Sequence, residues 1–278
     1  IAMGVLMLAV AAGVIWSLTQ GGGETPPLDG DGDGDSDASS IVNISGAEKT
    51  TIPRIQGEAG VSLVCTAPAG EKLSIQDMYE KVNPSTVLVV ADKGEQASIG
   101  TGVIMTADGY IITNAHVISG GKDCWIALDT GYTYDAKLVG YSEERDLAVL
   151  KAVDAADLPA ASFGDSDLCR VGDTVYAIGN PLGLGLAISS GIIGSTAHEL
   201  DRYALPCIVN SADISRGSSG GALMNAHGQV IGVTSGAYTY GNNMYLAVPV
   251  DPVMAADLTV SGWTLKEVKA IEAAKDKD

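Results

Sequence analysis

Three short segments of the chain carry side chains that could together perform nucleophilic catalysis. His116 ends the segment TNAH, directly after an apolar stretch, where its ring can project into a cleft. Asp146 stands immediately before the apolar segment LAVL, and Ser219 lies in the segment RGSSGG. A histidine can take the proton of a serine hydroxyl, and a buried aspartate can hold that histidine in the required tautomer. Each segment alone has an ordinary structural explanation, so the prediction rests on all three.

The glycines around Ser219 suit the same chemistry. A glycine at position 217 lets the neighbouring backbone N–H groups point at one spot, where they would stabilise a developing oxyanion. We therefore predict an oxyanion hole formed by Gly217, Ser218 and Ser219. In it the amides of Gly217 and Ser219 hold the oxygen, and Ser218 lies between them.

The order of these residues along the chain distinguishes two hydrolase arrangements. The spacing of Gly217, Ser219 and Gly221 also fits the nucleophile elbow of α/β-hydrolases, which needs serine, acid and histidine in that order. Only His227 follows Ser219, with no Asp or Glu between them, and strand–helix alternation is missing. The order histidine, aspartate, serine is instead that of chymotrypsin-like enzymes.

The sequence motifs predict no metal site. His198-Glu199 begins like a HExxH zinc helix, but Arg202 occupies the second ligand position. The acidic run from Asp29 begins like an EF-hand loop, but Ser40 occupies the position that needs a bidentate Glu. The four cysteines include no CxxC pair; they allow up to two disulfides or buried thiols, and no pairing is assigned.

Short apolar segments separated by glycine-rich turns indicate the elements that position these residues. A capping signal at Ser74 and Asp77 predicts a helix that ends at Pro84. Strands are expected at 86–91, 102–105, 110–113, 124–128, 136–141, 147–152, 174–178, 187–195, 207–210, 222–224, 230–234 and 244–249. Because long helices do not alternate with them, the strands predict an all-β sandwich or a pair of barrels.

The composition excludes two classes of protein. Lys and Arg number 16 against 34 Asp and Glu, and the formal net charge of −18 argues against a nucleic-acid partner bound through a broad basic face. Hydrophobic residues make up 46% of the chain, which is enough for a sizeable core and excludes a wholly disordered chain.

The N-terminal part of the chain predicts a location outside the cytoplasm. Residues 1–20 contain an apolar run of about 18 residues, which suits a transmembrane signal-anchor, with a cleaved signal peptide as the alternative. An acidic Gly/Asp-rich linker is expected at 21–40, and an N-terminal extension with one or two strands at 41–73. A charged tail is expected at 263–278.

Four motifs together resemble those of the HtrA/Deg trypsin-like serine proteases of bacteria. The motifs are GTGVIMTADGYIITNAH (100–116), RDLAVL (145–150), AIGNPLG (177–183) and GSSGG (217–221). The resemblance covers 74–262 and implies two six-stranded antiparallel β-barrels, with His116 and Asp146 in the first and Ser219 in the second. Only 16 residues follow Gly262, too few for the PDZ domain that most such proteases carry, so we expect none in this chain.

The resemblance implies a serine endopeptidase that hydrolyses peptide bonds of exported proteins without a cofactor. It suggests processing or quality control in the bacterial cell envelope and allows a homo-oligomer, while the apolar run in residues 1–20 predicts that the domain is anchored to a membrane. Two other functions stay open: a catalytically silent envelope protein that binds unfolded segments, and a serine esterase or thioesterase built on the same barrels.

The resemblance also suggests where a peptide substrate would bind. Its backbone is expected to pair with an edge strand that includes Val233, Thr234, Ser235 and Gly236. Asp213 lies six residues before Ser219, a position at the base of the S1 pocket in trypsin-like proteases, where an Asp selects Lys or Arg. Two alternatives stay open for Asp213: it binds a basic P1 side chain, or it is a turn residue and S1 takes small aliphatic side chains.

Overall fold

The computed structural model describes residues 50–55, 64–143, 145–180, 185–200, 203, 206–237 and 244–250. The predicted signal-anchor, acidic linker and charged tail lie outside these residues, as does about half of the N-terminal extension. Within the described ranges, no helix combines the length and the apolar character needed to cross a membrane.

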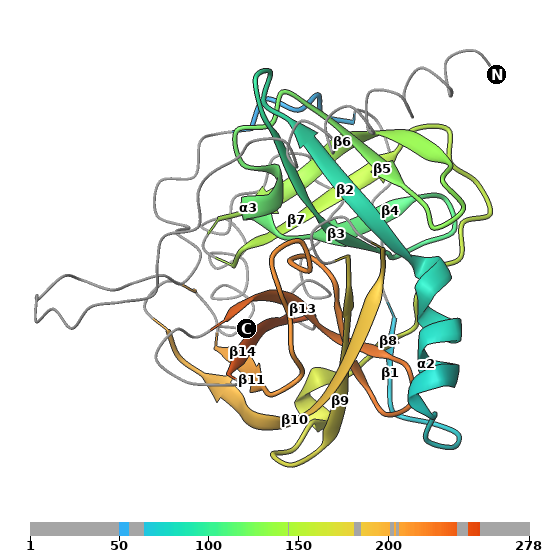
Figure 1. The fold of residues 1–278 in the computed structure, drawn as a ribbon, viewed down its shortest axis with the longest axis vertical. Coiled ribbons are helices and arrows are strands. Elements are labelled where there is room, and N and C mark those ends of the chain that lie inside the picture. Colours follow the sequence, from blue (N-terminus) through green and yellow to red (C-terminus); the bar gives the residue numbers. More distant parts are fainter. Residues whose placement is uncertain are drawn as a thin grey trace, which may run out of the picture. The chain divides into compact units, whose positions relative to one another are not determined.

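Six strands close into a first antiparallel barrel (Figure 1). Around the barrel their order is β2-β3-β4-β7-β6-β5. Their bounds are Thr86–Asp92 (β2), Ala97–Ile104 (β3), Tyr110–Thr113 (β4), Asp123–Ala127 (β5), Thr133–Ser142 (β6) and Leu147–Ala152 (β7). Alternate side chains point inward, and Val89, Ile111 and Leu150 are among those fully buried in the core.

A second barrel is formed by the strands that follow. These are Thr174–Gly179 (β9), Ala187–His198 (β10), Cys207–Asn210 (β11), Ala222–Asn225 (β12), Val230–Ala237 (β13) and Tyr245–Pro249 (β14). The strands pair in the order β13-β12-β9-β10-β11-β14, and the additional pairing of β14 with β13 closes the barrel. The all-β prediction of two six-stranded antiparallel barrels is therefore confirmed.

The two barrels share a buried apolar cluster. It contains Ile112 of β4 and Val149 of β7 from the first barrel together with Val233 of β13 and Met224 of β12 from the second. Burial of this cluster favours association of the two barrels, because apolar surface of both is removed from water. The seam between them is where the three candidate catalytic segments meet.

Two further pairings attach the N-terminal extension. The short strands Cys65–Thr66 (β1) and Phe163–Gly164 (β8) pair in parallel beside β13. Gln229 fixes this addition by donating from Nε2 to Thr66 Oγ1 over 2.7 Å. Residues 51–55 lie against the first barrel, where the amide of Ile55 donates to the carbonyl oxygen of Leu138 over 3.0 Å.

Helices are few and short in the described residues. The predicted helix is confirmed as α2 (Ile75–Val82), with Ser74 Oγ accepting from the amide of Asp77 over 3.1 Å. Two 3₁₀ turns lie at Asn83–Ser85 (η1) and Ser166–Leu168 (η2). The sequence patterns missed a four-residue helix, α3 (Ala115–Ile118), directly after β4.

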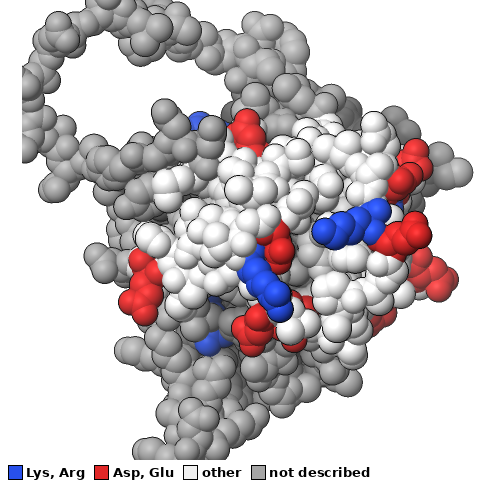
Figure 2. Space-filling view, turned by 90° about the horizontal axis from the view of Figure 1, so that it is seen from below, with Lys and Arg blue, Asp and Glu red and all other residues white. Residues whose placement is uncertain are grey.

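Charged side chains are scattered on the face of the molecule seen in Figure 2. There Lys and Arg lie beside Asp and Glu among uncharged residues. Among the residues described on this face, the basic side chains do not gather into a broad patch.

Candidate active site

His116 is placed by the transition from β4 into α3. The strand ends at Thr113, and the helix carries His116 as its second residue. Between them Asn114 is fully buried, and its Nδ2 donates to the backbone carbonyl oxygen of Asp146 over 2.8 Å. Asn114 Oδ1 has no hydrogen-bond partner among the described residues. Asn114 thus ties the segment that carries His116 to the segment that carries Asp146.

Asp146 presents a fully buried carboxylate just before β7. Its backbone has φ of 53°, in the left-handed region that few residues other than Gly adopt. The carboxylate accepts from the amide of His116 over 3.0 Å, and His116 Nδ1 lies 2.9 Å from Oδ1 and 2.8 Å from Oδ2. Because an ionised carboxylate can only accept, Nδ1 carries the proton and Nε2 is left as an acceptor.

A second donor reaches the same carboxylate from the other barrel. Ser235 Oγ on β13 donates to Asp146 Oδ2 over 2.5 Å, and Tyr203 Oη lies 2.8 Å from Ser235 Oγ. Since the single proton of Ser235 points to the carboxylate, Tyr203 donates to Ser235. The sequence pattern predicts Ser235 as a substrate-binding residue and gives no sign of its side-chain contact with Asp146. The side chain of Ser235 is fully buried, so only its backbone could face a substrate.

Ser219 lies in a tight loop that enters the seam from the second barrel. Its hydroxyl donates to the carbonyl oxygen of Ser235 over 3.1 Å. Ser235 therefore contacts Asp146 with its side chain and Ser219 with its carbonyl. Gly217 and Gly220 have φ of 97° and 87°, and a Cβ at Gly220 would collide with the carbonyl oxygen of Thr101. Only glycine fits this approach of the loop to the first barrel.

The backbone amides of the loop divide into two groups. Among the described residues, no acceptor is recorded for the amides of Gly217 and Ser219. The amide of Ser218 instead donates to the carbonyl oxygen of Ser215 over 2.9 Å. Of the three residues predicted to form the oxyanion hole, Gly217 and Ser219 thus have N–H groups available, whereas that of Ser218 closes a turn.

The predicted substrate strand is more enclosed than expected. The side chains of Val233 and Thr234 are buried, and Thr234 Oγ1 donates to the carbonyl oxygen of Ser218 over 2.7 Å. Gly236 pairs with Leu246 of β14. A substrate could therefore contact this segment only through backbone groups. The sequence suggested the segment but gave no sign of these side-chain contacts.

Comparisons with known proteins find trypsin-like peptidases. Residues 100–233 match the family of trypsin-like peptidase domains. A probable periplasmic serine endoprotease DegP-like of Halomonas elongata is 42% identical over 164 residues, which cover 58% of this chain and 34% of that protein. A protein of the same name from Hahella chejuensis is 32% identical over 249 residues, covering 88% and 50%.

The similar solved structures point the same way. An HtrA-type protease, AlgW with tripeptide, shares 34% identity with a TM-score of 0.59, over 64% of this chain and 60% of that one. The serine endoprotease from Yersinia pestis shares 33% identity with a TM-score of 0.58, over 66% and 65%. Residues 100–233 are a trypsin-like peptidase domain, and the relatives and solved neighbours of this chain are HtrA-type proteases. The chain spans between a third and half of the length of these curated relatives.

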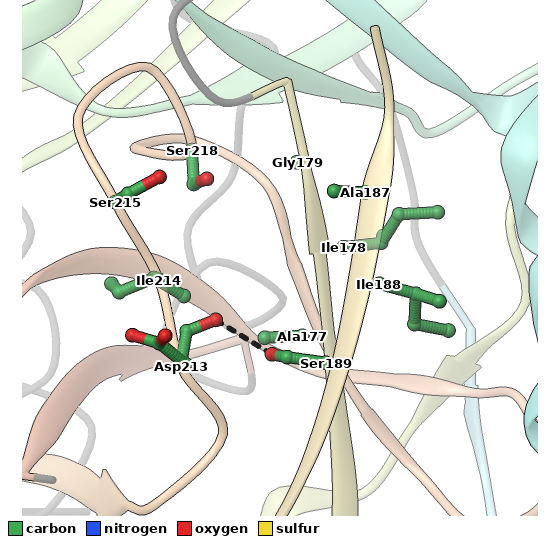
Figure 3. A pocket seen from close by; sticks show the side chains of 10 residues that line it. All are labelled: Ala177, Ile178, Gly179, Ala187, Ile188, Ser189, Asp213, Ile214, Ser215 and Ser218. Carbon is green, nitrogen blue, oxygen red and sulfur yellow. Dashed lines mark hydrogen bonds between the residues drawn. The ribbon is translucent and has the colours of Figure 1, made fainter.

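The backbone carbonyl and the side-chain carboxylate of Asp213 point to different sides of the loop that carries them. Its carbonyl oxygen accepts from Ser189 Oγ over 2.6 Å at a cavity of about 180 Å³, which also adjoins Ser218 (Figure 3). Its carboxylate points away from Ser189 and accepts from the hydroxyl of Tyr245, a hydrogen bond that raises the pKa of Tyr245. Tyr245 of β14 pairs with Ala237 at the end of β13. The carboxylate thus faces the side of the predicted substrate strand.

Two buried thiols belong to the cores of the two barrels, Cys124 to the first and Cys207 to the second. Burial, and after it the charge of Asp146, raises the pKa of Cys207 to about 12. Burial, with a smaller effect of Asp123, likewise raises the pKa of Cys124 to about 12. Both thiols are therefore protonated at neutral pH.

These thiols predict a loss of stability at alkaline pH. Their folded pKa values exceed the unfolded value of about 8.5, so their contribution is complete below that pH and is lost as pH rises towards 12. The slope is at most about 1.4 kcal/mol per pH unit for each thiol. We expect Tm to fall between pH 8.5 and 10.5 less steeply in Cys124→Ala and Cys207→Ala than in the wild type. Equal slopes in all three proteins would contradict the burial of these thiols.

Proposed function

We propose that this chain is a serine endopeptidase that uses His116, Asp146 and Ser219 as a catalytic triad. The observation that carries the proposal is the position of Ser235. Its side chain donates to the carboxylate of Asp146, and its carbonyl accepts from the hydroxyl of Ser219. The acid and the nucleophile thus lie on either side of one residue, and His116 is already oriented by the acid.

The mechanism follows from these contacts. Ser219 Oγ turns from the carbonyl of Ser235 towards His116 Nε2 when substrate binds, since hydrogen bonds of this kind are often misaligned before substrate arrives. It then attacks the scissile carbonyl carbon, and Nε2 takes its proton. The imidazolium, stabilised by Asp146, gives that proton to the leaving amine as the C–N bond breaks. Water hydrolyses the resulting acyl-enzyme by the same steps in reverse.

The oxyanion and the substrate backbone have separate sites in this proposal. The amides of Gly217 and Ser219 bind the oxyanion, supported by their lack of an acceptor among the described residues. Ser218 shapes the loop between them. Of the predicted segment 233–236, the backbone of Ser235 and Gly236 pairs with the substrate as an added strand, because Val233 and Thr234 already pair with neighbouring strands and the Ser219 loop.

The proposed setting is the bacterial cell envelope. Relatives are named periplasmic endoproteases, and neighbours have been solved with a tripeptide or a decapeptide. We propose that the chain processes exported proteins or removes damaged ones, anchored to the membrane through residues 1–20, as a monomer or a homo-oligomer. The reaction of the described residues needs no metal and no cofactor.

The first test is removal of each triad member. Ser219→Ala and His116→Ala should each abolish nearly all hydrolysis of a casein-type substrate, and the double variant should be little worse, because the residues act as one unit. Asp146→Asn should lower kcat by a factor on the order of 10⁴ by favouring the wrong tautomer.

The matched control for this test is His227→Gln. His227 lies in the turn between β12 and β13, where its carbonyl oxygen accepts from Lys81 Nζ over 3.0 Å. This variant should keep wild-type turnover. Peptide and ester substrates are assayed side by side. If Ser219→Ala hydrolyses peptides at the wild-type rate, the proposal is wrong; hydrolysis of esters alone would indicate an esterase.

The second test concerns the side chain before the scissile bond. Asp213 is exposed, and among the described residues its carboxylate has one side-chain partner, the neutral hydroxyl of Tyr245; a cationic P1 side chain would form a stronger, charge-assisted pair. We expect higher kcat/KM after Arg or Lys than after Val or Ala in a P1-varied peptide series. In Asp213→Asn this preference should be lost, and in the exposed Asp123→Asn control it should persist. An unchanged preference for Val or Ala in all three proteins would instead make Asp213 a turn residue.

A further inference from the structure

Three successive carbonyl groups of the Ser219 loop are held by donors from outside the loop. Thr101 Oγ1 donates to the carbonyl oxygen of Gly217 over 2.8 Å, and the amide of Thr101 donates to that of Ser219 over 2.8 Å. Between them Thr234 Oγ1 donates to the carbonyl oxygen of Ser218 over 2.7 Å. Thr101 belongs to β3 of the first barrel and Thr234 to β13 of the second. Both are completely or almost completely buried.

The two hydroxyl groups are themselves fixed in direction. The Thr101 hydroxyl accepts from the amide of Asn180 over 2.9 Å, so its one proton is directed to Gly217. The backbone of Thr234 donates to Gly221 over 2.9 Å and accepts from Gly220 over 2.8 Å. These bonds set the position from which its hydroxyl reaches Ser218. Hydrogen bonds outside these contacts thus fix the direction of the Thr101 hydroxyl and the position of the Thr234 hydroxyl.

Peptide planarity connects these contacts to the predicted oxyanion hole. In a trans peptide the carbonyl of one residue and the N–H of the next point in opposite directions. The carbonyl of Ser218 points towards the Thr234 hydroxyl, so the N–H of Ser219 in the same peptide points away from Thr234. Holding the carbonyl of Gly217 fixes the N–H of Ser218, which closes the turn onto Ser215 over 2.9 Å. That turn sets the peptide whose N–H belongs to Gly217.

We propose that Thr101 and Thr234 are positioning residues that aim the Ser219 and Gly217 amides at the developing oxyanion. This inference rests on the proposed peptidase function. Neither threonine touches the substrate; each acts through a carbonyl of the loop. We call the two hydroxyl contacts, Thr101 to Gly217 and Thr234 to Ser218, the clamp. Because one hydroxyl comes from each barrel, the oxyanion hole has its full strength only when the two barrels hold their native arrangement. For Thr234 this replaces the predicted role in substrate binding.

The experiment compares Thr234→Val and Thr101→Val with Thr234→Ser and Thr101→Ser in the full chain. Valine keeps the shape but removes the hydroxyl, whereas serine keeps the hydroxyl. We expect each valine variant to lower kcat about 10- to 100-fold with KM unchanged, less than or equal to the loss of an oxyanion donor. Affinity for a reversible peptide aldehyde, which forms a tetrahedral adduct, should fall in parallel. The serine variants should recover most of both losses.

Thr86→Val is the matched control. Thr86 is equally buried, and its hydroxyl donates to the carbonyl oxygen of Val82 over 3.1 Å, away from the loop. This variant should lose stability but keep kcat and aldehyde affinity.

Three results would overturn the clamp. The first is wild-type kcat in both valine variants. The second is a fall in kcat without a fall in aldehyde affinity. The third is a fall in kcat no greater than that of Thr86→Val at equal loss of Tm. If any one of these results appears while Ser219→Ala is inactive, the clamp proposal is wrong and the proposed peptidase function stands. If Ser219→Ala is active, the proposed function itself fails.

Discussion

Burying the carboxylate of Asp146 without hydrogen-bond donors would cost several kcal/mol. The protein supplies those donors from two places: the backbone and ring of His116 on α3, and the hydroxyl of Ser235 on β13. Asn114 donates to the backbone carbonyl oxygen of Asp146, whose backbone lies in the left-handed region. Because α3 connects β4 and β5 of the first barrel and β13 belongs to the second, satisfying one charge fixes the two barrels at the seam.

The loop of Ser219 meets a complementary constraint, which is steric. It lies so close to the neighbouring strands that a Cβ at Gly220 or Gly221 would collide with backbone carbonyl oxygens. Because of this close approach, the carbonyl oxygens of Gly217 and Ser218 accept hydrogen bonds from the hydroxyls of Thr101 and Thr234. An oxyanion hole made of backbone amides needs such prior orientation, because its catalytic value comes from dipoles that do not have to reorganise during the reaction.

The sequence predicted the parts of this site that depend on local pattern. His116, Asp146 and Ser219 stand beside apolar strands and in a glycine-rich loop; the strand pattern indicated a sandwich or a pair of barrels, and the family resemblance implied the two barrels. The contacts of Ser235, Thr234 and Tyr203 were missed because they depend on the register between β13 and distant segments. Tyr245, which binds the carboxylate of Asp213, lies 32 residues further along the chain (245 − 213) and has no local signal. Short-range spacing identifies residue types, whereas tertiary pairing decides which of them touch.

The central claim is that the environment of one serine makes it a nucleophile. It is tested most directly by treating the native protein with a fluorophosphonate probe and mapping the adduct by mass spectrometry. We expect a single labelled residue, Ser219, with labelling lost in His116→Ala while the protein remains folded. Labelling of Ser218 or another serine in place of Ser219, or labelling of Ser219 that persists undiminished in His116→Ala, would contradict it.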